Sequence, residues 1–236
     1  MYLSLFTAIV CASGALSSIL TAPCKINDLN CLENGIKSAI PQFLSGISDL
    51  GIEPSDPQFL EIIEGNFSGM KYTLYNTTIF GYDKCKLSNL KLSEDFKKVH
   101  SEANCSFLSM SGEYEISGQL ISIPIEGKGH FNVDSAEFII TVDYKTKKYQ
   151  NSDGKSHLYI EDFNVKAQPL NAKYNFQNLF NGQKELADTV HKFIRENWLK
   201  ITELFQYPVW NTSFKKMVNN MNMFLKNVAL EDISSN

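Results

Sequence analysis

Residues 184–207 read KELADTVHKFIRENWLKITELFQY, and this stretch decides the fold. Its apolar side chains recur at spacings of three and four, which places them on one wide stripe of a helix. We expect the helix to begin after Gly182 and to run until Pro208, because proline lacks an amide donor and crowds the preceding turn. About twenty residues give a helix about 30 Å long, too long for a small core unless a sheet wraps around it. The stripe contains Leu186, Val190, Phe193, Ile194, Trp198, Ile201, Leu204 and Phe205.

The preceding region, from Met70 to about Val165, has the period of two that is typical of strands with one buried face. Its apolar parity changes after Leu120, so we expect a bulge or bend there that turns both sets of side chains to one face. Asp153 and Gly154 predict a hairpin turn. The pattern therefore predicts the α+β class, with a long helix inside a strongly curved antiparallel sheet. The alternating positions include Met70, Tyr72, Leu74, Leu108, Met110, Tyr114, Ile116, Phe131, Val133, Phe138, Ile140, Val142 and Tyr144.

A second helix is expected after Asp28, a residue type that caps helices. Pro41 falls inside its pattern and is expected to kink or divide it. A final amphipathic stretch predicts one more helix before the polar end. No repeat or linker divides residues 23–236, which we expect to form one domain. The first helix carries Leu32, Ile36, Ile40, Phe43, Leu44 and Ile47, and the last carries Phe214, Met217, Met221 and Phe224.

Residues 1–22 are expected to be a signal peptide. The run MYLSLFTAIVCASGALSS is uncharged and apolar and ends in small residues, with Ser13 and Ala15 suitably placed for cleavage. Cleavage between about Ala15 and Ala22 would leave a secreted, extracellular protein. No Lys or Arg precedes the run, so a buried first helix stays open as an alternative. The run is too short to span a bilayer, and no later segment is uninterrupted enough to do so.

The chain has five cysteines, and four remain if Cys11 leaves with the signal peptide. An even number in an oxidising compartment predicts disulfides. Cys24 with Cys31 would close a short loop, and Cys85 with Cys105 would join neighbouring extended segments. We favour this pairing, with buried free thiols as the alternative. Zinc is not expected, because no pair has the close spacing of a structural site.

Four sequons agree with a secreted chain and predict that some of them carry glycans, each on an exposed loop or strand edge. They begin at Asn66, Asn76, Asn104 and Asn211.

Composition excludes several partners. The formal net charge is -4, and the lysines are spread along the chain. Nucleic acids and anionic membranes are held chiefly by clustered positive charge, so neither is an expected partner. Hydrophobic residues at 43% and charged residues at 20% are typical of a packed chain rather than a disordered one.

Motifs for catalysis are absent. The sequence lacks a nucleophile elbow, a zincin motif and a phosphate-binding loop with its lysine. Gly127 and Gly129 flank Lys128 without the third glycine of a dinucleotide loop, so we expect them to relieve crowding in a strand. We therefore expect no enzyme activity, no metal and no cofactor. The histidines are far apart in sequence and are expected to be surface or locally bonded residues: His100, His130, His157 and His191.

Several segments in order resemble the insect takeout and haemolymph juvenile-hormone-binding family. Residues 29–60, LNCLENGIKSAIPQFLSGISDLGIEPSDPQFL, follow that family's amino-terminal pattern. Residues 112–131, GEYEISGQLISIPIEGKGHF, are similar to its central strand pair, and the DGK at Asp153 and residues 178–198 extend the likeness. The chain departs at Ser48, where the family usually has proline, and in its last residues, VALEDISSN. The matching positions include Cys24, Cys31, Pro41, Gly46, Ile47, Asp49, Leu50, Asp56, Pro57, Gly112, Tyr114, Gly118, Pro124, Gly127 and Gly129.

The resemblance implies a tubular lipid-binding fold, with a hydrophobic tunnel between the long helix and the sheet. It implies a carrier, expected to be monomeric, that holds juvenile hormone, another terpenoid or a fatty-acid-like molecule without a covalent step. Tyr114 could orient a ligand oxygen or equally be a core residue bonded to backbone. Two alternatives stay open: recognition of microbial lipid or another extracellular partner, and a hormone esterase. The expected ligand contacts are Leu32, Ile36, Ile40, Phe43, Leu44, Leu108, Met110, Tyr114, Phe131, Phe138, Ile140, Phe180, Leu186, Val190, Phe193, Ile194 and Trp198.

Overall fold

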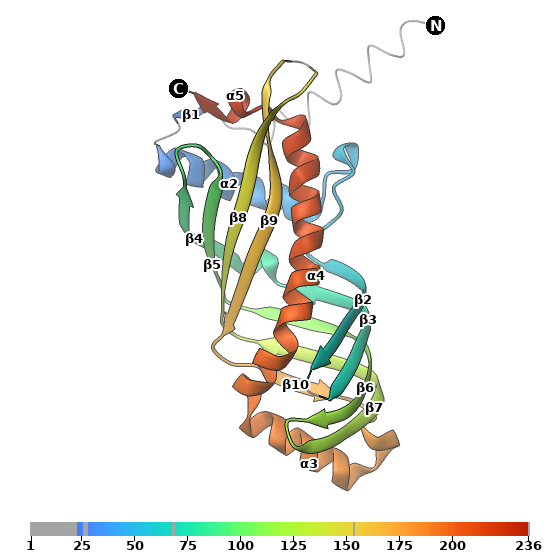
Figure 1. Cartoon of the computed structure of the whole chain (residues 1–236). Helices are drawn as coiled ribbons and strands as arrows, with labels where there is room; N and C mark the ends of the chain where they lie inside the picture. The colour runs from blue at the N-terminus through green and yellow to red at the C-terminus, as the bar shows by residue number, and fades with distance from the viewer. Residues whose placement is uncertain (1–22, 26–27, 68, 153, 236) are drawn as a thin grey trace, which may run out of the picture.

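The long axis of the molecule is set by one helix, α4 (Trp198–Asn227), and antiparallel strands curve around it (Figure 1). The computed structural model describes residues 23–25, 28–67, 69–152 and 154–235. The expected signal peptide therefore lies outside the described residues. Helix α3 (Lys184–Glu196) and strand β10 (Lys173–Phe176) lie at one end, and α2 (Leu29–Ser45) and α5 (Leu230–Ile233) lie toward the other.

The expected helix over residues 184–207 is two helices, and its predicted end at Pro208 is wrong. Helix α3 stops at Asn197, whose side-chain amide donates to the Phe193 carbonyl oxygen at 2.9 Å. Helix α4 then continues through Pro208 and includes the stretch that we expected to be a separate last helix. The Tyr72 hydroxyl donates to the Phe205 carbonyl oxygen at 3.2 Å, one turn before the proline. This contact supplies a donor where proline disturbs the helical hydrogen bonds.

The predicted α+β class with antiparallel strands is confirmed, and the long strands divide into two sheets. All neighbouring strands within these two sheets are antiparallel. The five-stranded sheet has the order β10, β7 (Ile123–Ser135), β6 (Leu108–Leu120), β3 (Met70–Phe80) and β2 (Gln58–Phe67). The four-stranded sheet has the order β4 (Cys85–Leu92), β5 (Lys98–Cys105), β8 (Phe138–Gln150) and β9 (Ser156–Pro169).

The change of parity near Leu120 marks a hairpin rather than the expected bulge or bend within one strand. Leu120 pairs with Ile123, and the two residues between them form a tight turn. Side chains of β6 and β7 can then face the same core although they differ in parity along the chain. Strands β8 and β9 form the hairpin that was expected, in which the Gly154 amide donates to the Asn151 carbonyl oxygen at 3.0 Å. Asp153, the other predicted turn residue, lies outside the described residues.

Helix α2 is capped as predicted, because the Asp28 carboxylate accepts from the Cys31 amide at 3.0 Å. Pro41 lies inside this helix and does not divide it. Disulfides join Cys24 to Cys31 and Cys85 to Cys105, the two pairs favoured from the sequence. The first of them ties α2 to β1 (Cys24–Lys25), which pairs in parallel with β11 (Ser234–Ser235). The described residues also form three short 3-10 helices: η1 (Ser48–Leu50), η2 (Tyr82–Lys84) and η3 (Phe180–Gly182).

The main core lies between α4 and the inner faces of the two sheets. Ile201, Phe205 and Val209 project from α4 into this cluster, and both sheets contribute buried residues to it. Gly129 lets strand β7 lie close to the loop that contains Gln177. A Cβ atom at Gly129 would lie only 2.5 Å from the Gln177 carbonyl oxygen. The expectation that this glycine relieves crowding in a strand is confirmed.

Candidate functional site

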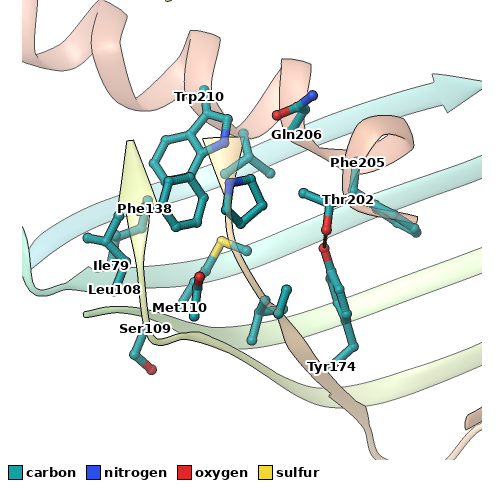
Figure 2. Close-up of a pocket in the computed structure, with 15 residues that line it drawn as sticks. Ile79, Leu108, Ser109, Met110, Phe138, Tyr174, Thr202, Phe205, Gln206 and Trp210 are labelled. Carbon is teal, nitrogen blue, oxygen red and sulfur yellow. Dashed lines mark hydrogen bonds between the residues drawn. The ribbon is translucent and has the colours of Figure 1, made fainter. Parts of the chain in front are cut away.

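A cavity lies between the first half of α4 and both sheets (Figure 2). The centre of a water-sized sphere can move within about 60 Å³ of this cavity. A cavity of this size holds a few water molecules, whereas pockets for drug-sized ligands are commonly about 300–1,000 Å³. A larger occupant therefore requires the wall side chains to move. The walls are formed by Ile79, Leu108, Ser109, Met110, Val133, Ser135, Phe138, Pro169, Ala172, Tyr174, Thr202, Phe205, Gln206, Val209 and Trp210.

Aromatic rings supply much of the wall. Trp210 of α4 meets Phe138 of β8 edge-on, with ring centroids 5.1 Å apart. Phe205, about one turn earlier on α4, lies 4.7 Å from the Tyr72 ring. Phe205 also lies 6.4 Å from the ring of Phe176 on β10. Rings on the inward face of α4 therefore meet rings from both sheets, and the cavity surface is largely apolar.

Most polar groups of the cavity wall already have hydrogen-bond partners within the protein. The Tyr174 and Thr202 hydroxyl oxygens lie 2.6 Å apart, the contact drawn as a dashed line in Figure 2, and the Thr202 hydroxyl donates to the Trp198 carbonyl oxygen at 2.9 Å. Thr202 thus accepts from Tyr174. Burial raises the pKa of Tyr174 to about 12, which keeps its hydroxyl neutral at ordinary pH. The Ser109 hydroxyl donates to the Asp134 carboxylate at 2.7 Å.

Three of the expected ligand contacts line this cavity: Leu108, Met110 and Phe138. A second group is buried in the surrounding core without lining it, and consists of Tyr114, Phe131, Ile140, Phe180, Val190 and Ile194. Leu44 and Phe193 pack against the same core from partly buried positions.

The other expected contacts lie away from the cavity wall. Phe43 belongs to a smaller cluster, where its ring meets Phe224 edge-on at 6.5 Å. Ile36 and Leu186 are exposed, with 41% and 47% of their surface accessible. Leu32, Ile40 and Trp198 are half-buried and do not line the cavity. Helix α2 thus contributes no wall residue.

The Tyr114 hydroxyl is hydrogen-bonded to the backbone, which is one of the two roles expected for Tyr114. It donates to the Gln177 carbonyl oxygen at 2.7 Å, and burial raises its pKa to about 12. The polar residues of the cavity wall are instead ones that the sequence analysis did not single out: Ser109, Ser135, Tyr174, Thr202 and Gln206. Tyr174 alternates with buried Phe176 on a four-residue strand, a run too short to be recognised by its period.

A second hollow follows β4, β5, β8 and β9 and has about 550 Å³ by the same measure. Charged side chains that already have partners take part in its walls. His100 lies 2.7 Å from the Asp143 carboxylate, and the Lys145 ammonium donates to Asp162 at 3.0 Å. Covering such groups with an apolar molecule costs solvation free energy, so the apolar cavity beside α4 suits a hydrophobic ligand better despite its smaller volume.

All four histidines are surface or locally bonded residues, as expected. His100 bonds Asp143, His157 bonds the Leu225 carbonyl oxygen at 3.0 Å, and His191 bonds the Phe176 carbonyl oxygen at 3.0 Å. His130 is exposed on β7. Within the described ranges, no group of three or more His, Cys, Asp or Glu residues is arranged to hold a metal ion. In the same part of the chain, no helix is both long enough and apolar enough to cross a membrane.

A long helix enclosed by curved antiparallel strands, with a hydrophobic cavity between them, defines the tubular lipid-binding fold. The crystal structure of Epiphyas postvittana Takeout 1 matches with a TM-score of 0.86 and 26% identity, covering 92% of this chain and 100% of that one. The family described as "Haemolymph juvenile hormone binding protein (JHBP)" matches residues 3–235, and the chain belongs to this family.

Curated relatives agree with this placement. The chain is 23% identical over 187 residues to "Circadian clock-controlled protein daywake" of Drosophila melanogaster, covering 74% of this chain and 72% of that protein. The Drosophila yakuba protein of the same name is 23% identical over 186 residues, with the same coverage.

Proposed function

We propose that this protein is a secreted, monomeric carrier that holds one small hydrophobic molecule noncovalently in the cavity beside α4. The observation that carries the proposal is the composition of the cavity wall. Aromatic and aliphatic side chains surround it, and the Tyr174 and Thr202 hydroxyls are already bonded to protein groups. Such a wall stabilises an apolar molecule by removing it from water and offers little to a charged one.

Burial alone can supply useful affinity. A terpenoid of about fifteen carbons would gain on the order of 12 kcal/mol gross at roughly 0.8 kcal/mol per methylene. Association costs of several kcal/mol at least then leave micromolar or tighter binding feasible. The wall must expand to admit such a molecule. Met110 is suited to this movement, because its side chain is unbranched and adopts many rotamers.

The proposed ligand is juvenile hormone, another terpenoid or a fatty-acid-like molecule. Membership of a juvenile-hormone-binding family supports this range. Native mass spectrometry of protein purified from its own source tests it, with a co-purified apolar molecule as the expected result. Protein that carries no such molecule and takes up no terpenoid or fatty acid would count against the carrier. Turnover of a hormone ester by the pure protein would support an esterase instead, and tight binding of lipopolysaccharide would support microbial-lipid recognition.

Secretion is the second part of the proposal. The apolar first residues support it, as do the two disulfides, which persist in oxidising compartments. Amino-terminal sequencing should find a first residue between about position 16 and position 23, and recovery of protein that still begins at Met1 would reject the signal peptide.

Glycans are the third part, and the sites are Asn66, Asn76, Asn104 and Asn211. All four side chains are exposed. In the sequon that begins at Asn211, the third residue is Ser213, whose hydroxyl is buried and donates to the Gln58 side-chain oxygen at 2.6 Å. Attachment at Asn211 must therefore precede folding of α4, and we expect this site to be used least. Peptide mapping before and after glycosidase treatment measures each occupancy.

A further inference from the structure

One buried acceptor in the cavity wall has no partner. The side-chain oxygen of Gln206 is shielded from water and accepts no hydrogen bond, and within the part of the wall that the structure describes it alone has this property. Gln206 lies on α4 between Thr202 and Trp210 (Figure 2). Buried polar groups in folded proteins are nearly always hydrogen-bonded, so an unpaired one calls for an explanation.

The neighbouring polar groups do not supply a donor. The Tyr174 hydroxyl points to Thr202, and the Thr202 hydroxyl is directed at the Trp198 carbonyl oxygen. The Ser109 and Ser135 hydroxyls donate elsewhere, to the Asp134 carboxylate and the Asn171 carbonyl oxygen. Every hydroxyl proton of the wall is thus committed to another acceptor. A molecule that enters the cavity and displaces wall side chains can supply the missing donor for Gln206.

We propose that Gln206 selects hydrophobic ligands that carry one neutral hydrogen-bond donor, such as a terpenoid alcohol or a protonated long-chain acid. The inference rests on the proposed carrier function and narrows its ligand class. The apolar body of the ligand packs against the rings of Phe138, Phe205 and Trp210, and its hydroxyl donates to the Gln206 oxygen. Esters and ethers of the same skeleton have acceptors only, and they leave this oxygen unpaired.

The experiment compares farnesol with farnesyl methyl ether, which share a carbon skeleton and differ in the donor. Each displaces a fluorescent fatty acid from the purified full-length secreted protein. Wild type should bind the alcohol roughly tenfold more tightly than the ether, as expected when a buried acceptor gains or lacks its partner. Gln206→Met keeps the unbranched shape without the acceptor, and it should bind both probes alike. Gln168→Met, on the exposed face of β9, is the matched control and should keep the preference.

Each outcome has one meaning. Equal affinities in wild type overturn the role of Gln206 but leave the carrier function standing, and so does a preference that persists in Gln206→Met. If Gln206→Met fails to fold, Gln206→Leu takes its place: it also lacks the acceptor and should bind both probes alike, and a preference for the alcohol that persists there would overturn the inference. If wild type binds neither probe nor the fluorescent fatty acid, the carrier function and the inference fail together.

Discussion

The indole of Trp210 meets the ring of Phe138 edge-on, with centroids 5.1 Å apart and planes at 66°. This contact joins α4 to the four-stranded sheet at the cavity wall. Edge-to-face pairs contribute about 0.5–1.5 kcal/mol beyond the burial of their area. The pair therefore fixes the helix against the sheet at the level where a ligand would bind.

A double-mutant cycle should detect this coupling. Phe138→Ala is expected to lower the free energy of unfolding by about 3–5 kcal/mol, because it leaves a hole in the core. The effects of Phe138→Ala and Trp210→Ala should differ from additivity by about 0.5–1.5 kcal/mol in urea denaturation. Strict additivity would show that the two rings do not stabilise one another.

Alkaline pH should destabilise the fold through its buried tyrosines. Burial raises the pKa of Tyr114, Tyr144 and Tyr174 to about 12, and it raises the pKa of Tyr72 and Tyr82 further. The unfolded chain releases these protons near pH 10, so it binds fewer protons than the folded chain above that pH. Stability is therefore complete below about pH 10 and falls as the pH rises toward about 12. Tyrosinate absorbance should increase together with loss of near-ultraviolet circular dichroism. Full ionisation at pH 10 in a folded protein would contradict the burial.

The disulfides should contribute unequally to stability. Cys85 and Cys105 are 20 residues apart and close a longer loop than Cys24 and Cys31, which are 7 apart. Loop entropy predicts a loss of about 3 kcal/mol when the longer loop is opened and about 2 kcal/mol for the shorter one. Paired Cys-to-Ala variants in thermal denaturation measure the difference. Peptide mapping without reduction checks the connectivity, and a crossed pairing would contradict the arrangement of β4 and β5.

Gly129 should not tolerate a side chain. Its added Cβ atom would meet the Gln177 carbonyl oxygen at 2.5 Å, in the loop whose backbone also accepts from Tyr114. Gly129→Ala is expected to cost about 1–3 kcal/mol, as overpacking does. Gly154→Ala is a control for crowding, since nothing lies within 4 Å of the Cβ position there, although its left-handed backbone adds a smaller strain of its own. A loss at Gly129 no larger than at Gly154 would argue against the close approach.

The period of the apolar residues predicted the class of fold because it depends on local backbone geometry. It could not predict that α4 continues through Pro208, since the Tyr72 hydroxyl that donates beside the break comes from β3. Strand β2 escaped notice because Glu61 and Ile62 are both exposed and interrupt its alternation. A local pattern also cannot show that two hairpin strands with opposite parity share one core.

The cavity wall was predicted less well than the fold. An amphipathic stripe shows which face of a helix is buried, but it does not show what the face packs against. Phe43 and Val190 both lie on such stripes. Phe43 nevertheless packs in a separate small cluster, and Val190 is buried in the main core without lining the cavity. Leu108, Met110 and Phe138 were identified because inward strand positions beside the first half of α4 border the cavity. Gln206 was missed because a glutamine on a helix is normally a solvated residue.

The central claim is tested most directly by titrating a fluorescent fatty acid into wild type and into two variants in which phenylalanine replaces an alanine. Ala172 is a small, half-buried residue of the cavity wall, and Ala172→Phe should fill the space that the ligand needs. Ala136→Phe places the same ring on an exposed turn as a control. With circular dichroism showing that both variants are folded, Ala172→Phe should lose at least about tenfold in affinity, equivalent to about 1.4 kcal/mol, and Ala136→Phe should bind as wild type does. Unchanged affinity in folded Ala172→Phe would show that the ligand does not occupy this cavity.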